Sequence, residues 1–168
     1  SLAANMLHLC GKGNVTECTD MVKEAIKSGK AFDKLVEMVK AQGGDSSVIT
    51  DTDNFAKAPF TYDVCSLSEG YVTHMNTEQC GIASVELGAG RATKESTIDY
   101  AAGIMLHKKI GSYVKQGEVL ATLYASDRNM FEDAEKLLLE AYTINMEKPS
   151  IEPLIFARVS KEGIEKYS

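Results

Sequence analysis

The spacing of the hydrophobic residues changes once along this chain, and the change restricts the folds that are open to it. Through residues 1–44 apolar side chains recur every three or four positions, which is the period of one α-helical face. Through residues 58–160 most apolar residues stand in short runs bounded by glycine or polar turns, which is typical of β-strands. The sequence therefore predicts an α+β chain, with a helical segment at 1–44 and a strand-rich domain at 58–160.

The helical segment is expected to contain three amphipathic helices. The first begins near Leu2 with no capping residue ahead of it, so we expect the chain to start inside or just before a helix of a longer protein. Asn14 or Thr16 is placed to cap the second helix, and Gly29 to end it in the left-handed conformation. The third helix is predicted over residues 31–40, ahead of two glycines.

The strand-rich domain is expected to form short strands on both sides of one long helix. The helix is predicted over residues 128–142, a last strand over 154–159, and a frayed tail after it. The buried stripe of the helix is expected to contain Phe131, Ala134, Leu137, Leu138 and Ala141. The five strands ahead of the helix are predicted at residues 61–67, 70–75, 81–87, 103–110 and 118–125.

Charge, cysteine spacing and hydropathy exclude several classes of protein. The formal net charge of -6 argues against a nucleic-acid-binding surface, which needs clustered Lys and Arg. The four cysteines, at positions 10, 18, 65 and 80, form no CxxC pair, so we expect reduced thiols in a cytoplasmic protein rather than disulfides or zinc. No apolar run is long enough to span a membrane, and no signal peptide is visible.

Residues 110–125, IGSYVKQGEVLATLYA, contain two glycines that permit tight turns and two apolar residues, Val114 and Leu120, that are expected to point inward. This frame resembles the turn that closes the flattened β-barrel of lipoyl and biotinyl carrier domains. A carrier of that kind needs a modifiable lysine at a hairpin tip. The nearest candidate, Lys94, follows a threonine and lies in a long loop. A non-catalytic carrier or interaction module is therefore kept only as the alternative function.

The long stretch ELGAGRATKESTIDYAAGIMLHKKIGSYVKQGEVLATLYA, residues 86–125, resembles the pyrimidine-nucleoside phosphorylase and thymidine phosphorylase family. It contains the pattern L-G-x-G-R, then I-D, then G-I, and then G-x-x-V-x-x-G-E-x-L. The stretches ANMLHLCGKG at 4–13 and KAQGGDSSVI at 40–49 are also similar to that family. The similarity is colinear over roughly residues 1–160, which makes it more specific than one motif.

The resemblance implies a cytoplasmic, homodimeric enzyme of nucleoside salvage that splits uridine or thymidine with phosphate into a free base and a pentose 1-phosphate. Members of the family have a helical lobe, an α/β lobe that binds phosphate and a potassium ion, and a C-terminal part with a barrel-sandwich hybrid, the α/β-hammerhead. By this resemblance, residues 1–44 would be the last helices of the α/β lobe. Residues 58–160 would be the lipoyl-like hammerhead domain.

The same resemblance implies that the catalytic half lies upstream of Ser1. The phosphate-binding signature of the family, Lys-x-Ser-Thr-Gly-Gly, does not occur in this sequence, and neither does the group that holds the pyrimidine. We therefore predict no catalytic, substrate-binding or metal-binding residue in this chain. The expected partners are the N-terminal lobes of the same enzyme and a second subunit. The choice between uridine, thymidine and a nucleotide such as AMP would also be made upstream.

Local candidates for a site are few. The loop Gly88–Arg91 could cradle phosphate, but a structural loop in which Arg91 pairs with an acid such as Asp99 is the favoured interpretation. The three histidines, His8, His74 and His107, are scattered over separate elements without metal-ligand spacing, which indicates surface or core roles. Four methionines are predicted to fill the core, at positions 21, 38, 105 and 130. Exposed apolar faces at Leu2, Met6 and Leu35 would favour self-association.

Overall fold

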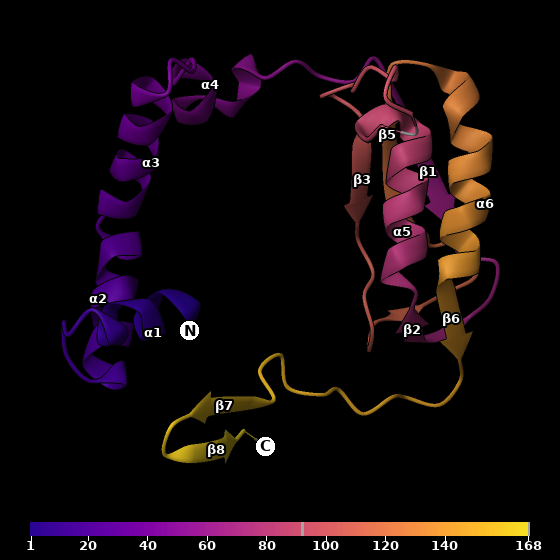
Figure 1. Cartoon of the computed structure of the whole chain (residues 1–168). Helices are drawn as coiled ribbons and strands as arrows, with labels where there is room; N and C mark the ends of the chain where they lie inside the picture. Colours follow the sequence, from indigo (N-terminus) through magenta and orange to yellow (C-terminus); the bar gives the residue numbers. More distant parts are fainter. Residues whose placement is uncertain (92, 168) are drawn as a thin grey trace. The chain divides into compact units, whose positions relative to one another are not determined.

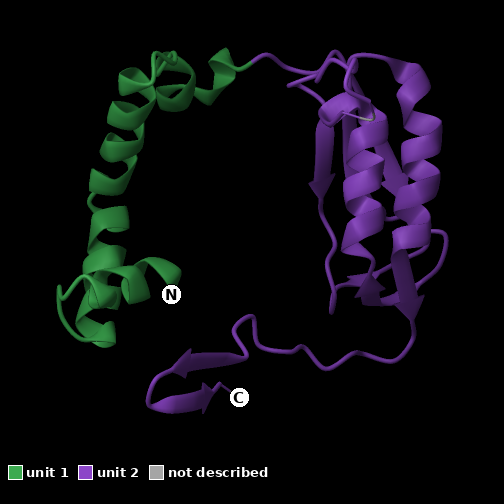
Figure 2. Ribbon diagram, viewed as in Figure 1, with its two compact units in different colours: residues 1–55 green, residues 56–168 purple. Residues whose placement is uncertain are grey.

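The chain divides into two compact units, Ser1–Phe55 and Ala56–Ser168, each of which is described by itself (Figure 2). The computed structural model describes residues 1–91 and 93–167. The first unit is helical and the second combines helices with antiparallel sheets, as Figure 1 shows. The predicted α+β class is therefore confirmed.

The first unit contains three helices, as predicted, followed by two single turns. Asn14 caps the second helix in a capping box. Its side chain accepts from the Glu17 amide at 2.9 Å, and the Glu17 carboxylate accepts from the Asn14 amide at 2.8 Å. Gly29, at φ 81°, takes the left-handed conformation between two helices. The elements are α1 Leu2–Leu9, α2 Val15–Lys27, α3 Lys30–Ala41, α4 Ser47–Thr50 and the 3₁₀ turn η1 Thr52–Asn54.

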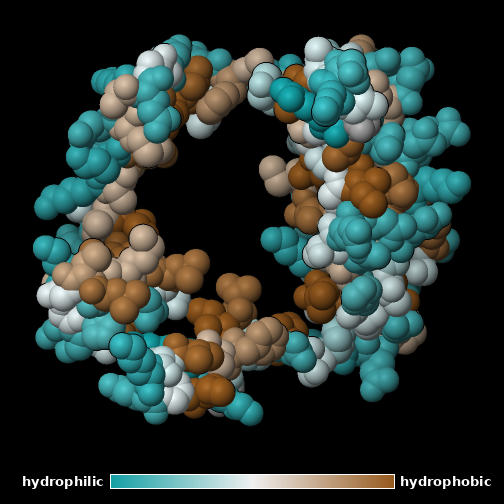
Figure 3. All heavy atoms as spheres, viewed as in Figure 1, coloured by the Kyte–Doolittle hydropathy of each residue, from teal (hydrophilic) through white to brown (hydrophobic). Residues whose placement is uncertain are grey.

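The helices of the first unit bury little of their apolar surface. Among its described residues only Ala4 and Cys18 are buried, whereas Leu2 and Leu9 are each 84% exposed and Ile26 is 68% exposed. Figure 3 shows apolar side chains at the surface of this unit. Because helices of this length owe most of their stability to packing, these faces are suited to contact with further protein.

The second unit is built on two three-stranded antiparallel sheets and a separate hairpin. In the first sheet the order is β1-β5-β3, so that β1 and β3 form its edges. In the second sheet the order is β4-β2-β6. The strands are β1 Phe60–Cys65, β2 Gly70–Met75, β3 Gly103–Leu106, β4 Tyr113–Val114, β5 Val119–Ala125 and β6 Tyr142–Asn145, and the hairpin pairs β7 Ala157–Ser160 with β8 Gly163–Lys166.

Two helices lie side by side against these sheets, α5 Thr77–Ser84 and α6 Phe131–Ala141 (Figure 1). A π-helical turn, η2 Val85–Ala89, follows α5, and a 3₁₀ turn, η3 Arg128–Met130, precedes α6. Both helices and both sheets share one core, which does not lie inside a closed barrel. Its buried members are Val64, Val72, Ala83, Leu87, Val114, Leu120, Ala121, Leu123, Ala125, Phe131, Ala134, Leu138 and Tyr142.

The predicted strand at 81–87 is wrong, because these residues form the end of α5 and the turn η2. The Asn76 side chain accepts from the Gln79 amide at 3.2 Å and so starts a helix where the sequence suggested a strand. Ala83 and Leu87 are buried four positions apart, which is the spacing of one helical face.

The predictions for the long helix, the last strand, the tail and four core methionines also need correction. The helix expected to reach residue 142 ends at Ala141, and Tyr142 begins the strand β6, which was not predicted. The last strand starts later than the expected 154–159, and the tail expected to fray forms its partner β8. The four methionines predicted in the core are instead between 41% and 54% exposed, namely Met21, Met38, Met105 and Met130.

Candidate functional site

The Gly88–Arg91 loop is fixed by contacts that only glycine permits. Gly88 has φ 94°, a conformation that L side chains rarely adopt, and its carbonyl accepts from the Asp99 amide at 2.9 Å. At Gly90 an added Cβ would lie 2.8 Å from Cγ2 of Val85 in the preceding turn. The backbone conformation at Gly88 and the close approach of Val85 at Gly90 therefore explain both glycines without a ligand.

The predicted ion pair between Arg91 and Asp99 is wrong. The Asp99 carboxylate instead accepts from the Ala101 amide at 2.9 Å and from the Ser126 amide at 3.1 Å, and no ion pair within the described residues joins it to Arg91. Hydrogen bonds from Ser126 and then from Ala101 hold the pKa of Asp99 below its usual value. Asp99 thus ties the loop to the end of β5, while Arg91 stays exposed.

Lys94 does not occupy the place of a carrier lysine. It lies in an exposed turn between Thr93 and Ser96, whose side chains bond to each other, rather than at the tip of a hairpin between two strands. A lysine that receives a swinging arm needs the hairpin position. The geometry therefore does not favour the carrier function.

The turn at residues 108–118 has the geometry that its sequence predicts. Gly111 and Gly117 have φ 89° and 80°, and Val114 and Leu120 are buried, as expected. Lys108 forms an ion pair with Glu118, which also accepts from the Lys115 amide at 2.9 Å. The Lys108 contact and then the Lys115 amide lower the pKa of Glu118. The contacts of Glu118 with Lys108 and Lys115 close the turn.

Tyr142 connects this turn to the beginning of β6. Its hydroxyl donates to the Lys108 carbonyl at 2.9 Å, and burial raises its pKa from 10.0 to about 12. The folded chain therefore keeps the Tyr142 proton in a pH range where the unfolded chain has already lost it.

Stability should consequently fall as the pH rises from about 10 towards about 12, because unfolding releases the Tyr142 proton in that range. Chemical denaturation across this range measures the effect. The variant Tyr142→Phe, which has no proton to release, is expected to show a shallower fall than the parent chain. Equal slopes in the two proteins would contradict this role of Tyr142.

The histidines lie apart, as predicted, but one of them takes part in a hydrogen-bonded row. Nε2 of His107 lies 2.8 Å from the Thr122 hydroxyl, which donates to Oδ1 of Asp63 at 2.6 Å. Because the Thr122 proton goes to the carboxylate, His107 must donate through Nε2. The row runs from Asp63 on β1 through Thr122 on β5 to His107, which directly follows β3. Sequence reasoning missed it, because only the register of the strands brings these residues together.

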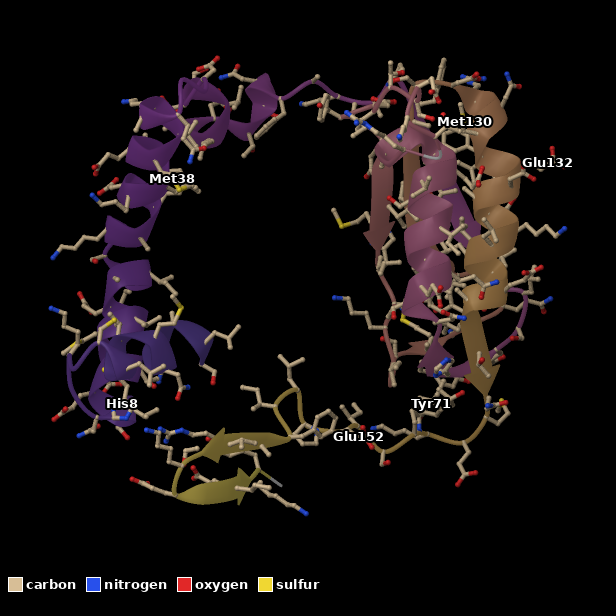
Figure 4. The ribbon with its side chains drawn as sticks, in the orientation of Figure 1. His8, Met38, Tyr71, Met130, Glu132 and Glu152 are labelled. Atoms are coloured by element: carbon tan, nitrogen blue, oxygen red, sulfur yellow. The ribbon has the colours of Figure 1, made fainter. Side chains whose placement is uncertain are left out.

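The other two histidines lie on separate elements, α1 and β2. Nδ1 of His8 lies 2.8 Å from the Gly13 carbonyl, which can only accept, so that this contact closes the end of α1; His8 is labelled in Figure 4. His74 is exposed on β2.

A metal site in a protein needs several His, Cys, Asp or Glu side chains close together. Throughout residues 1–91 and 93–167, no three His, Cys, Asp or Glu side chains gather closely enough to hold a metal ion. All four cysteines are free thiols. None of the helices in this described part is long and apolar enough to cross a membrane. Arg91 is exposed at the end of the Gly88–Arg91 loop.

Comparison with known proteins gives one consistent result. Residues 71–145 match the family described as the pyrimidine nucleoside phosphorylase C-terminal domain. The chain is 37% identical over 160 residues to a pyrimidine-nucleoside phosphorylase of Geobacillus stearothermophilus, an alignment that covers 95% of this chain and 37% of that protein. It is 41% identical over 138 residues to the protein of the same name from Bacillus subtilis, covering 82% of this chain and 32% of that protein.

A third relative, from Staphylococcus aureus, carries the same name and is 39% identical over 145 residues, which are 86% of this chain and 33% of that protein. The chain thus spans about a third of the length of the curated relatives that it matches. The matched domain contains the fixed loop, the closed turn and the start of β6. The chain therefore belongs to the pyrimidine-nucleoside phosphorylase family and represents its C-terminal part.

Proposed function

We propose that this chain is the C-terminal part of an enzyme that cleaves pyrimidine nucleosides with phosphate and releases the free base and a pentose 1-phosphate. The observation that carries the proposal is the similarity over 95% of the chain to a protein named pyrimidine-nucleoside phosphorylase. Uridine and thymidine are the expected substrates. The selection between them is assigned to residues outside this chain.

The chemistry of the reaction supports a structural role for this part. Cleavage of the glycosidic bond passes through a positively charged, oxocarbenium-like state, beside which a phosphate dianion must be held by preorganised cations and N–H donors. Arg91 is exposed, and the side chains of Lys108 and Glu118 are paired with each other. Phosphate and a potassium ion would therefore be bound by the other lobes of the enzyme.

Residues 58–160 are proposed to correspond to the lipoyl-like α/β-hammerhead of the family. The turn closed by Lys108 and Glu118, and the burial of Val114 and Leu120, support this part of the proposal. Residues 1–44 are proposed to be the last helices of the α/β lobe. On this assignment, their exposed apolar faces would pack against the rest of that lobe. We expect the full-length enzyme to be a homodimer in the cytoplasm.

The 168-residue chain alone is expected to release no uracil from uridine and phosphate, because the anion-binding and base-binding groups are assigned to the other lobes. Chromatography of the reaction mixture measures free base. The full-length relative from Bacillus subtilis, at the same concentration, serves as the positive control. Phosphorolysis by the purified chain that disappears in the variant Arg91→Ala would overturn the structural role and assign the chemistry to this part.

A further inference from the structure

We propose that the free edge of β1 and the facing side of α6 form a groove that binds an extended basic peptide segment as an additional β-strand. The groove has a volume of about 640 Å³. Four consecutive residues line it, namely Pro59 and the first three residues of β1, together with α6 and the turn before it. Successive side chains of a strand point to opposite faces, so a groove lined by four in a row must run along the backbone edge.

The edge of β1 is open to such pairing. β1 is the terminal strand of the β1-β5-β3 sheet, and its only partner in that sheet is β5. Pro59 marks one end of the open stretch, and the irregularity between Val64 and Cys65 marks the other. Edge strands present unpaired N–H and C=O groups, and peptide segments commonly bind by adding a strand to them. The stretch between these two marks is long enough for four or five residues of a partner.

The other wall of the groove favours a basic partner. Glu132 and Glu135 lie three positions apart on α6, so they share one helical face, and Figure 4 shows Glu132 projecting away from the helix. The Tyr62 hydroxyl lies 3.0 Å from both carboxylate oxygens of Glu135 and fixes the orientation of that group, whose remaining lone pairs stay available. The charge of Arg128 already faces the Phe60 ring, at 4.5 Å from the ring centre.

Aromatic rings make the floor of the groove rigid. Tyr62 stacks on Phe131, with ring centres 5.6 Å apart and an angle of 23° between the ring planes. On the partner strand, side chains at alternate positions are roughly 7 Å apart and point to the same side. Lys or Arg at two such positions would reach the two carboxylates over the aromatic floor. The formal charge of -6 on the whole chain adds attraction at longer range.

An NMR titration of the whole ¹⁵N-labelled chain with a capped peptide of alternating lysine and valine tests this proposal. We expect amide shifts centred on residues 60–64 and 132–135. A capped peptide of alternating glutamate and valine should give none. The lysine peptide with N-methylated backbone amides should bind far more weakly, because it keeps the charges but cannot pair as a strand.

The double variant Glu132→Gln/Glu135→Gln should weaken binding about fivefold or more, as expected for the loss of two exposed charge pairs. The matched control is Asp133→Asn, a loss of charge on the same helix outside the groove. Circular dichroism confirms that each variant is folded. Equal binding of the N-methylated peptide, equal weakening by Asp133→Asn, or no shift at residues 60–64 would each overturn the proposal.

Discussion

Replacing Leu138 by alanine is expected to lower the free energy of unfolding of residues 56–168 by about 3 kcal/mol. Leu138 is fully buried in the middle of α6 and belongs to the core that both sheets and both long helices share. The change removes apolar contacts and leaves a cavity that the surrounding strands cannot fill without moving. Urea denaturation followed by circular dichroism measures the loss.

The neighbouring residue provides a matched control. Leu137 lies on the same helix and has the same side chain, but it is only partly buried at the border of the core. The variant Leu137→Ala should cost about 1 kcal/mol, since less apolar area is lost and solvent can occupy the space. If both variants lost the same stability, the side of α6 that faces the core would be assigned wrongly.

Replacing Gly70 by alanine is expected to destabilise the second unit by about 3 kcal/mol, through strain and crowding together. Gly70 begins β2 at φ 148°, where a Cβ would lie 2.6 Å from the Asn145 carbonyl oxygen and 3.1 Å from Cγ2 of Ile144. Both neighbours belong to the paired strand β6, so they cannot yield without breaking the β2–β6 register. Thermal unfolding followed by circular dichroism reports the change.

Gly103→Ala is the control for this prediction. Gly103 also begins a strand, β3, but its φ is not positive and nothing lies within 4 Å of the added Cβ. We expect a change of a few tenths of a kcal/mol at most, because neither strain nor a clash arises. A loss at position 103 as large as at position 70 would show that the close approach to β6 is not the cause.

Secondary structure was predictable where one period governed a long segment. Of the five residues predicted for the buried stripe of α6, Phe131, Ala134, Leu138 and Ala141 are buried, and Leu137 is partly buried. In α5 and η2 the sequence contains Ile82 and Val85, which favour strands locally, yet the cap at Asn76 and packing against α6 produce helical structure. Tertiary contacts decided that segment, and a single sequence does not display them.

The candidate site was predictable only in its local parts. The glycines of the turn at 108–118 directly indicate left-handed backbone positions, because few other residues adopt that conformation. The partner of Asp99 was not predictable. Ser126 lies far along the chain from it and reaches Asp99 through a backbone N–H, which any residue carries. The Asp63–Thr122–His107 row likewise depends on strand register, which has no local signature.

The first unit buries much less of its apolar surface than the second, and this difference affects how the two units evolve. The second unit closes a core of its own, so recombination could transfer it intact between genes. The first unit buries only Ala4 and Cys18 among its described residues. Substitutions on its helices should therefore be accepted or rejected by whatever surface covers them. The first 55 residues are expected to evolve in step with that surface, and the rest of the chain largely at its own pace.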